Sequence, residues 1–193
     1  MPDRVSQGAV NPLRADARRN HDALVTAAAA VFAAAGVDAP IKEIADQAGV
    51  GVGTFYRRFP TRADLIVAVL RQEVDGCAGA ADVLVAQYPP FEALTRWIDR
   101  FLDLVVKKRG LAAALQSDAP GYAALRADFE AKLVPSLQGL MNAAAGDVRA
   151  DISAAELWQA IALLCGAAKP CDFEPTRRMV ALLINGLQTP EQV

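Results

Sequence analysis

The side chains best suited to chemistry in this chain lie together in one short segment: Thr54, Tyr56, Arg57 and Arg58. Hydroxyl, phenol and guanidinium groups donate hydrogen bonds to phosphate oxygens and to the edges of bases. Phe55 and Phe59 are four residues apart and can face a core, which leaves the polar side chains on another surface. The pattern indicates a surface that binds nucleic acid. It also fits an ordinary solvated helix face, and the spacing alone leaves both interpretations open.

A helix, a turn and a second helix must position these side chains. Apolar residues at three- and four-residue intervals predict a helix over about 42–48: Ile41, Ile44, Ala45 and Ala48. Gly49 follows directly, and a glycine there allows the left-handed backbone conformation that reverses the chain. The second helix opens near 51–53 and ends before Pro60. The pattern is that of a helix-turn-helix, which also occurs as plain core architecture.

Helices are also predicted on both sides of this segment. A stripe on a helix near 15–35 can cover the helix-turn-helix pair: Leu24, Ala28, Val31, Phe32 and Ala35. After Pro60, a helix runs to about residue 75, where Gly76 and Gly79 loosen it before a helical continuation over 80–87. Thr61 and Asp64 form a possible capping box at its start.

The second half of the chain is also helical in pattern. Five further helices are predicted near 91–108, 110–117, 121–145, 153–168 and 173–187. Strict alternation of apolar and polar residues is absent, so we expect an all-α fold. The expected organisation is a flexible tail, a three-helix N-terminal helix-turn-helix domain and a larger helical C-terminal domain, at residues 1–13, 14–62 and 63–193.

Composition and charge are compatible with this organisation. The chain has 193 residues, 53% of them apolar, and can bury a substantial core. Its formal net charge of −2 would by itself argue against nucleic acid. However, residues 1–62 hold eight Lys and Arg against six Asp and Glu, while 63–193 hold twelve against sixteen. Phosphate binding depends on where the cations lie and not on their sum.

Catalytic and metal sites are not indicated. The only histidine, His21, and three cysteines, Cys77, Cys165 and Cys171, lack metal-ligand spacing. The sequence has no glycine-rich phosphate loop and no nucleophile elbow. We therefore predict no catalytic residue, no metal and no cofactor. Buried free thiols are the expected state of the cysteines, and a redox switch between Cys165 and Cys171 is the alternative.

A longer string of residues carries a family resemblance. The segment IKEIADQAGVGVGTFYRRFPTRADLIVAV resembles the DNA-binding segment of the TetR (tetracycline repressor) family of bacterial transcriptional regulators. The preceding HDALVTAAAAVFAAAGVDAP is similar to the first helix of that family. The resemblance in motif covers about residues 14–75, and beyond them only length and helical layout agree.

The resemblance implies which residues meet DNA. It places Lys42 and Arg62 near the DNA backbone, and Arg58 in a slot that is often His. It also implies that Val52, Gly53, Thr54 and Tyr56, on the recognition helix, contact bases and phosphates. When Arg57 is added, the candidate DNA-binding residues are Lys42, Val52, Gly53, Thr54, Tyr56, Arg57, Arg58 and Arg62. Gly51 is a departure, because the family usually has Ser there. Glycine is still an acceptable N-cap, but a hydroxyl for phosphate is lost.

A small-molecule site in the larger domain is implied by the family's usual design, in which a regulatory domain releases DNA when a ligand binds. Aromatic and aliphatic stripes at helical spacing are ordinarily packed core, and the sequence alone favours that interpretation. The candidate cavity walls are the helices near 91–108 and 121–145 and the end of the helix from 65. The candidate pocket residues are Leu70, Val74, Trp97, Phe101, Leu104, Tyr122, Leu125 and Phe129.

The last two predicted helices are apolar on most sides and must bury more than one face. A second subunit is the simplest cover for them, and small residues at 160, 162 and 166 permit close approach. The candidate interface residues are Leu157, Trp158, Ile161, Cys165, Val180, Leu183 and Ile184. A two-fold homodimer would present two recognition helices about one DNA turn apart, which predicts a near-palindromic operator.

The sequence thus predicts a homodimeric, DNA-binding transcriptional regulator, with repression favoured, that an apolar small molecule releases from a double-stranded operator. The alternatives are a DNA-binding dimer without an effector and one switched by its thiols. Residues 1–13 do not form a signal peptide, and no apolar run approaches the roughly eighteen residues of a membrane span. We therefore expect a cytoplasmic protein without membrane contacts.

Overall fold

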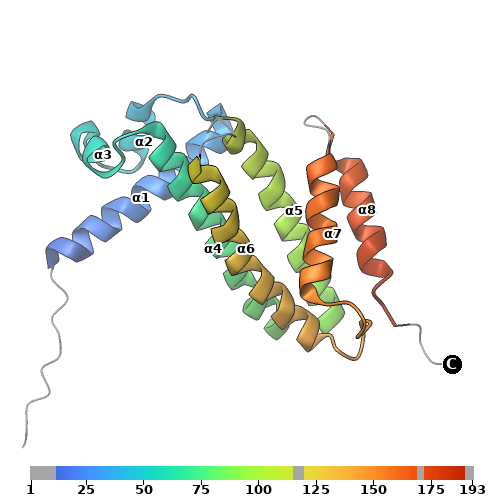
Figure 1. Cartoon of the computed structure of the whole chain (residues 1–193). Helices are drawn as coiled ribbons and strands as arrows, with labels where there is room; N and C mark the ends of the chain where they lie inside the picture. The colour runs from blue at the N-terminus through green and yellow to red at the C-terminus, as the bar shows by residue number, and fades with distance from the viewer. Residues whose placement is uncertain (1–11, 115–119, 169–171, 190–193) are drawn as a thin grey trace, which may run out of the picture. The chain divides into compact units, whose positions relative to one another are not determined.

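The structure is a computed structural model in which residues 12–114, 120–168 and 172–189 are described. The prediction of an all-α fold is confirmed. Within the described ranges the chain forms helices and no strand, apart from an isolated β-bridge between Val148 and Gln188. The helices, labelled in Figure 1, are α1 (Pro12–Ala35), α2 (Ile41–Gln47), α3 (Val52–Arg58), α4 (Arg62–Gln87), α5 (Pro90–Ala114), α6 (Pro120–Ala143), α7 (Ala154–Ala167) and α8 (Glu174–Asn185).

The chain divides into two compact units, residues 1–69 and 70–193. The first unit contains α1, α2, α3 and the start of α4, and the helix-turn-helix is α2 and α3. The expected flexible tail at 1–13 lies almost wholly outside the described residues. The core of this unit includes Leu24, Ala28, Val31, Phe32, Ile44, Ala45, Phe55, Phe59, Leu65 and Ile66.

The turn between α2 and α3 depends on the left-handed backbone of Gly49, whose φ is 68°. The Gly49 amide donates to the Asp46 carbonyl at 3.1 Å, and the Val50 amide donates to the Ala45 carbonyl at 3.0 Å. This pair of bonds is a Schellman motif, which satisfies carbonyls at the end of α2 and reverses the chain. The expected role of Gly49 is therefore confirmed.

The expected capping box is present at the start of α4. The Thr61 amide donates to Asp64 Oδ2 at 3.0 Å, and the Asp64 amide donates to Thr61 Oγ1 at 3.2 Å. These bonds satisfy backbone donors that a helix N-terminus otherwise leaves without partners. The same device starts α7, where the Ser153 hydroxyl accepts from the Glu156 amide and the Glu156 carboxylate accepts from the Ser153 amide.

Two helices are longer than the sequence predicted. The structure continues α4 without interruption through Gly76 and Gly79, because its inner face buries Val74, Cys77 and Ala81 on both sides of the glycines. Tertiary burial of this kind outweighs a glycine's cost of about 1 kcal/mol in a helix. Likewise α5 continues through Gly110 to Ala114, so the predicted break between 91–108 and 110–117 was wrong.

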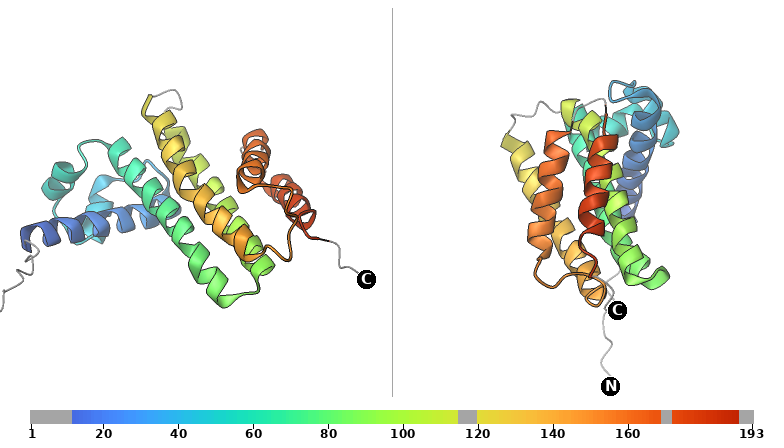
Figure 2. Two further views of the ribbon diagram at one scale, coloured as in Figure 1. Left: turned by 60° about the horizontal axis from the view of Figure 1, so that its bottom comes forward. Right: turned by 90° about the vertical axis from the view of Figure 1, so that its right-hand side faces the viewer.

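The second unit is built on long helices that run side by side, α5 and α6 with the later part of α4 (Figures 1 and 2). The Trp97 side chain of α5 is fully buried, and its Nε1 donates to the Cys77 carbonyl of α4 at 2.8 Å. The helix α7 packs on α6, and α8 packs on α7. No helix within the described ranges is long and apolar enough to cross a membrane.

We expect Gly49→Ala to lower the free energy of unfolding by about 1 kcal/mol, because an L-residue strains a left-handed backbone even where its Cβ meets open space. Gly49 has no heavy atom within 4 Å of an added Cβ, so any loss would come from the backbone alone. Urea denaturation of the full chain, followed by circular dichroism, measures it.

The matched control is Gly53→Ala in α3, which also meets open space but has an ordinary helical backbone. We expect this variant to be as stable as the wild type or about 0.5 kcal/mol more stable. Equal effects of the two substitutions would contradict the backbone explanation.

Candidate nucleic-acid interface

The helix α3 presents one face to the core and the other to solvent. Phe55 is 1% exposed, and Phe59, which caps the C-terminal end of α3, is 4% exposed. Val52 and Tyr56 are 39% and 53% exposed, large values for apolar and aromatic side chains. Monomeric proteins scatter such residues singly, but here two lie on one short helix among polar neighbours, so α3 carries a candidate contact surface.

Thr54, Tyr56 and Arg57 of α3 make contacts within the helix. The Arg57 Nη2 donates to Thr54 Oγ1 at 3.0 Å. The Thr54 hydroxyl still has its own proton to donate, and the Arg57 guanidinium keeps further N–H groups. The Tyr56 ring meets the Phe55 ring edge-on, with centroids 5.3 Å apart, which rests the phenol against the buried aromatic of the same helix.

Arg58 is held from another helix. Its Nε donates to Nδ1 of His21 in α1 at 3.1 Å, and the His21 ring lies against Phe59 with centroids 5.1 Å apart. The pKa of His21 is lowered, first by its partial burial and then by the Arg58 charge, while Asp22 acts in the opposite direction. His21 is a residue that the sequence prediction did not include, because it lies 37 residues from Arg58.

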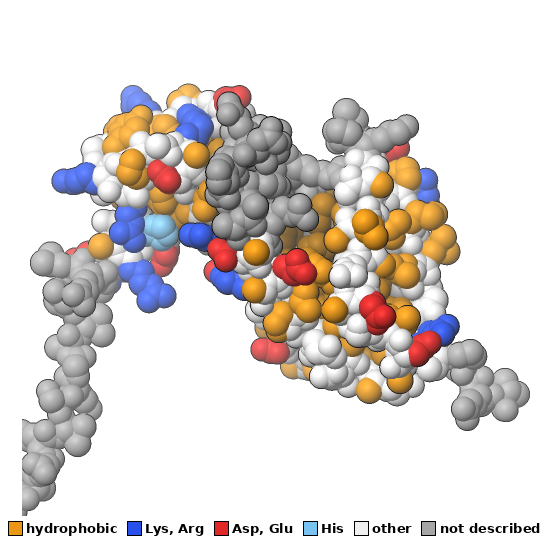
Figure 3. All heavy atoms as spheres, viewed as in Figure 1, with side chains coloured by type: hydrophobic (Ala, Val, Ile, Leu, Met, Phe, Trp, Pro, Cys, Tyr) orange, Lys and Arg blue, Asp and Glu red, His pale blue; other side chains and the backbone are white. Residues whose placement is uncertain are grey.

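The remaining DNA-binding candidates lie on both sides of α3. Lys42 is exposed near the start of α2, and Gly53 is exposed on α3 with no side chain to reach a base. Arg62, at the start of α4, is half-buried and donates from Nη1 to the Val37 carbonyl. Several basic side chains lie on the N-terminal side of the face shown in Figure 3, with acidic and apolar side chains between them. The structure thus brings the eight predicted residues onto α2, α3 and the adjoining start of α4.

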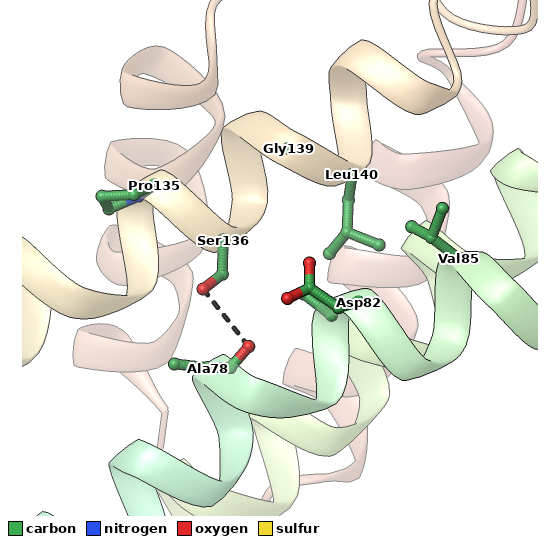
Figure 4. Close-up of a pocket in the computed structure, with 8 residues that line it drawn as sticks. Ala78, Asp82, Val85, Pro135, Ser136, Gly139 and Leu140 are labelled. Atoms are coloured by element: carbon green, nitrogen blue, oxygen red, sulfur yellow. Dashed lines mark hydrogen bonds between the residues drawn. The ribbon is translucent and has the colours of Figure 1, made fainter. Parts of the chain in front are cut away.

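The predicted pocket residues are placed in the core of the second unit. Each of those with a described side chain is at most 7% exposed, and the Tyr122 side chain lies outside the described residues. A pocket of about 400 Å³ lies between α4 and α6, where Asp82 and Val85 stand opposite Ser136 and Leu140 (Figure 4). A second, of about 710 Å³, lies between α4 and α5 beside Gly79. None of the seven predicted residues with a described side chain lines either of these two pockets.

The predicted interface residues mostly point into their own subunit. Trp158 and Leu183 are half-buried. The other five are at most 6% exposed in the single chain: Leu157, Ile161, Cys165, Val180 and Ile184. Trp158 packs on Phe101 of α5, with ring centroids 4.8 Å apart. The large apolar residues that do face outward are Leu163, Met179 and Leu182, exposed by 76%, 46% and 64%. None of these three was among the predicted interface residues.

Metal and thiol chemistry find little support in the described residues. No group of three or more His, Cys, Asp and Glu side chains there could hold a metal ion. The thiols of Cys77 and Cys165 are buried, and burial raises the pKa of the Cys77 thiol to about 11, away from the reactive thiolate. Cys171 lies outside the described residues, so the Cys165–Cys171 alternative is untested.

Comparisons with known proteins cover nearly the whole chain. Residues 24–69 match the model of the tetR family of bacterial regulatory proteins, and residues 89–189 match the C-terminal domain of SbtR-like transcriptional regulators. No curated protein matches the chain.

Solved structures give the same result. A TetR transcriptional regulator from Streptomyces coelicolor is 36% identical, with a TM-score of 0.69 over 87% of this chain and 98% of that one. A TetR regulatory protein from Mycobacterium vanbaalenii is 35% identical, with a TM-score of 0.70 over 92% and 100%. The reduced form of NemR from Escherichia coli, at 15% identity, shares the fold, with a TM-score of 0.64 over 90% and 100%.

These matches agree with the geometry of the helix-turn-helix. The N-terminal family model spans the turn at Gly49 and all of α3, whose polar side chains face solvent. The C-terminal family model alone spans more than half of the chain. Two solved TetR regulators share over a third of their aligned residues with it across almost their full length. The chain therefore belongs to the TetR family of DNA-binding bacterial transcriptional regulators.

Proposed function

We propose that this regulator is a homodimeric repressor that reads a near-palindromic operator with α3 and leaves it when a small apolar molecule binds the second unit. The observation that supports DNA reading by α3 is the exposure of Val52 and Tyr56 beside Arg57 and Arg58, while Phe55 anchors the helix. Aromatic and hydroxyl groups contact base edges, and guanidinium groups bind phosphate or guanine.

Each candidate residue has its own role in this proposal. Tyr56 and Thr54 contact base edges, Val52 makes an apolar contact with a thymine methyl group, and Gly53 lets the backbone approach DNA. Arg57 reaches DNA from its position on Thr54. Lys42, Arg58 and Arg62 bind phosphate. The bond from Arg62 to Val37 uses one of five guanidinium donors, so phosphate contact remains open to the others.

We expect Tyr56→Ala to weaken specific operator binding roughly tenfold to a hundredfold, because one good base contact contributes about 1–3 kcal/mol of discrimination. The operator is first selected by the wild-type protein from a library of random duplexes, and footprinting and titration then measure the variant. Nonspecific binding to other duplexes should change little.

The control is Tyr88→Ala, which removes a half-buried tyrosine from the second unit, where Arg96 lies over its ring. Tyr88→Ala should bind the operator like the wild type. A Tyr56→Ala footprint identical to that of the wild type would show that α3 does not read the operator through this side chain.

For the homodimer, we propose an interface on the outward side of α7 and α8. Its apolar residues are Leu163, Met179 and Leu182, with the half-buried Trp158 and Leu183 at its margin. Ala162 and Gly166 are exposed and small, which permits close approach of a partner helix. The buried residues from the sequence prediction, such as Ile161 and Ile184, support this surface from inside the subunit. Obligate interfaces are similarly apolar.

We expect Leu182→Glu to dissociate the dimer, because a partner subunit would bury the new carboxylate without a counter-ion. Sedimentation velocity at micromolar concentration measures the mass. The matched control is Val83→Glu on α4, which is also exposed, at 53%, but lies outside the proposed interface. The control should sediment as a dimer, and a Leu182→Glu variant that remains dimeric would place the interface elsewhere.

For the effector, we propose a site among the apolar residues of the second unit predicted above. Support comes from the gathering of Leu70, Val74 and Trp97 with Phe101, Leu104, Leu125 and Phe129 in one apolar core. A ligand must open space there and so acts by its preference for one arrangement of the helices. Because α4 is one continuous helix from Arg62, a change in the packing of its second-unit part would be transmitted along the helix to its N-terminal end. The alternatives are an effector-free dimer and a thiol switch.

We expect some small apolar compounds to raise the melting temperature and to release a fluorescent operator, with or without reductant. Two variants separate the possible sites. Gly139→Phe fills the pocket between α4 and α6, and Gly79→Phe fills the pocket between α4 and α5, each from a position with open space. Both variants should respond like the wild type. Loss of the response in one would assign the effector to that pocket, and a response to oxidant alone would favour the thiols.

A further inference from the structure

We propose that His21 in α1 is a positioning residue for DNA recognition, whose neutral ring holds Arg58 of α3 in the direction in which it meets DNA. The role in DNA binding rests on the proposed function, whereas the pairing of the two side chains does not. Loss or protonation of the ring would then free Arg58 and lower the affinity of the protein for DNA.

The contact joins two helices that are far apart in the chain. Nδ1 of His21 lies 3.1 Å from Nε of Arg58 and accepts its proton, so the neutral ring must carry its own proton on Nε2. The ring is half-buried and lies against Phe59, at a centroid distance of 5.1 Å and an interplanar angle of 31°. Because Phe59 is itself buried, the acceptor has a fixed place relative to the end of α3.

The bond restricts Arg58 without using up its phosphate-binding groups. With Nε engaged, both terminal nitrogens of the guanidinium remain available to pair with phosphate oxygens. An unrestrained arginine loses rotamer freedom when it binds, so a side chain that is already held binds at a lower entropic cost. Arg57 is restrained as well, but by Thr54 of its own helix, which makes it a suitable comparison.

Protonation of His21 would reverse the contact. A proton on Nδ1 removes the acceptor and places two cations side by side, so Arg58 must turn away. The charged groups that act on His21 are Arg58 of α3, which lowers its pKa, and Asp22 of α1, which raises it, with partial burial as the larger lowering influence. The pKa of His21 in the folded protein therefore lies below its ordinary value of 6.5. Arg58 would lose its positioning only at a pH acidic enough to protonate the ring.

The first experiment tests the pair without DNA. The chain has one histidine, so the tag-free protein gives a single histidine signal in a two-dimensional NMR pH titration. Arg58→Gln should raise the titration midpoint toward 6.5, and the control Arg57→Gln should leave it in place. An Arg58→Gln midpoint equal to that of the wild type would overturn the pairing.

The second experiment tests the role in recognition. It measures the affinity for the selected operator and for random duplex between pH 5.5 and 8. His21→Phe keeps a ring over Phe59 but has no acceptor, and it should lower both affinities roughly threefold to tenfold at pH 7.5, because a phosphate contact acts on every sequence. His21→Gln keeps an acceptor that does not titrate, so it should preserve both affinities and remove the part of their decline in acid that His21 causes.

The double variant His21→Phe with Arg58→Gln should lose no more than Arg58→Gln alone, because the two residues act through one contact. Additive losses, or a His21→Phe variant with the wild-type affinities and pH profile, would refute the positioning role. Those outcomes leave the proposed function standing if the wild type still selects an operator. A wild type that selects none would remove the proposed function and this role together, while the NMR midpoint would still report the pair.

Discussion

The burial of Phe55 and Phe59 is the constraint on which the proposed DNA-reading surface depends. A helix of seven residues has almost no stability of its own in water, so α3 exists because its inner face is packed. Burying a phenylalanine side chain contributes about 1.5–3 kcal/mol, which is large against the cost of ordering so short a segment. Since both rings are almost fully buried, the rotation of α3 is fixed, and the residues between them must face outward. The rotation of α3 thus decides both which of its residues pack in the core and which face solvent.

The sequence was sufficient for the parts of the fold that local signals determine. Gly49, with its positive φ, and the Thr61–Asp64 capping box are read from single residues and fixed spacings. It was insufficient where tertiary burial decides. The glycines at 76 and 79 suggested a loosened helix and the glycine at 110 a break, but α4 and α5 continue through them. The apolar residues of α7 and α8 form two stripes each, and periodicity alone does not say which stripe a helix buries inside its own subunit. The structure places Ile161 and Ile184 inside and Leu163 and Leu182 outside.

The candidate site shows the same division. The eight predicted DNA-binding residues lie on consecutive elements, and short-range spacing with a family resemblance was enough to propose them. The contacts that hold them were not predictable, because they join distant segments. Arg58 pairs with His21 across 37 residues, and Arg62 pairs with the Val37 carbonyl across 25. The sequence around a histidine in α1 gives no signal that its partner lies in α3. Its one visible feature in the sequence was its position, three residues before the buried Leu24.

The distribution of ion pairs explains why a chain with a net negative charge can still bind DNA at one end. In the second unit Arg71, Lys107, Lys132 and Arg177 pair with carboxylates of other helices: Asp128, Glu73, Asp75 and Asp103. Such exposed pairs add little stability, but they neutralise the cations that form them. On α2 and α3 the arrangement differs. Among the described residues no carboxylate forms an ion pair with Lys42, Arg57 or Arg58, and the two arginines bond to a hydroxyl and an imidazole. Neutral partners leave the full charge of these side chains available to phosphate, which supports the proposal that α2 and α3 bind DNA.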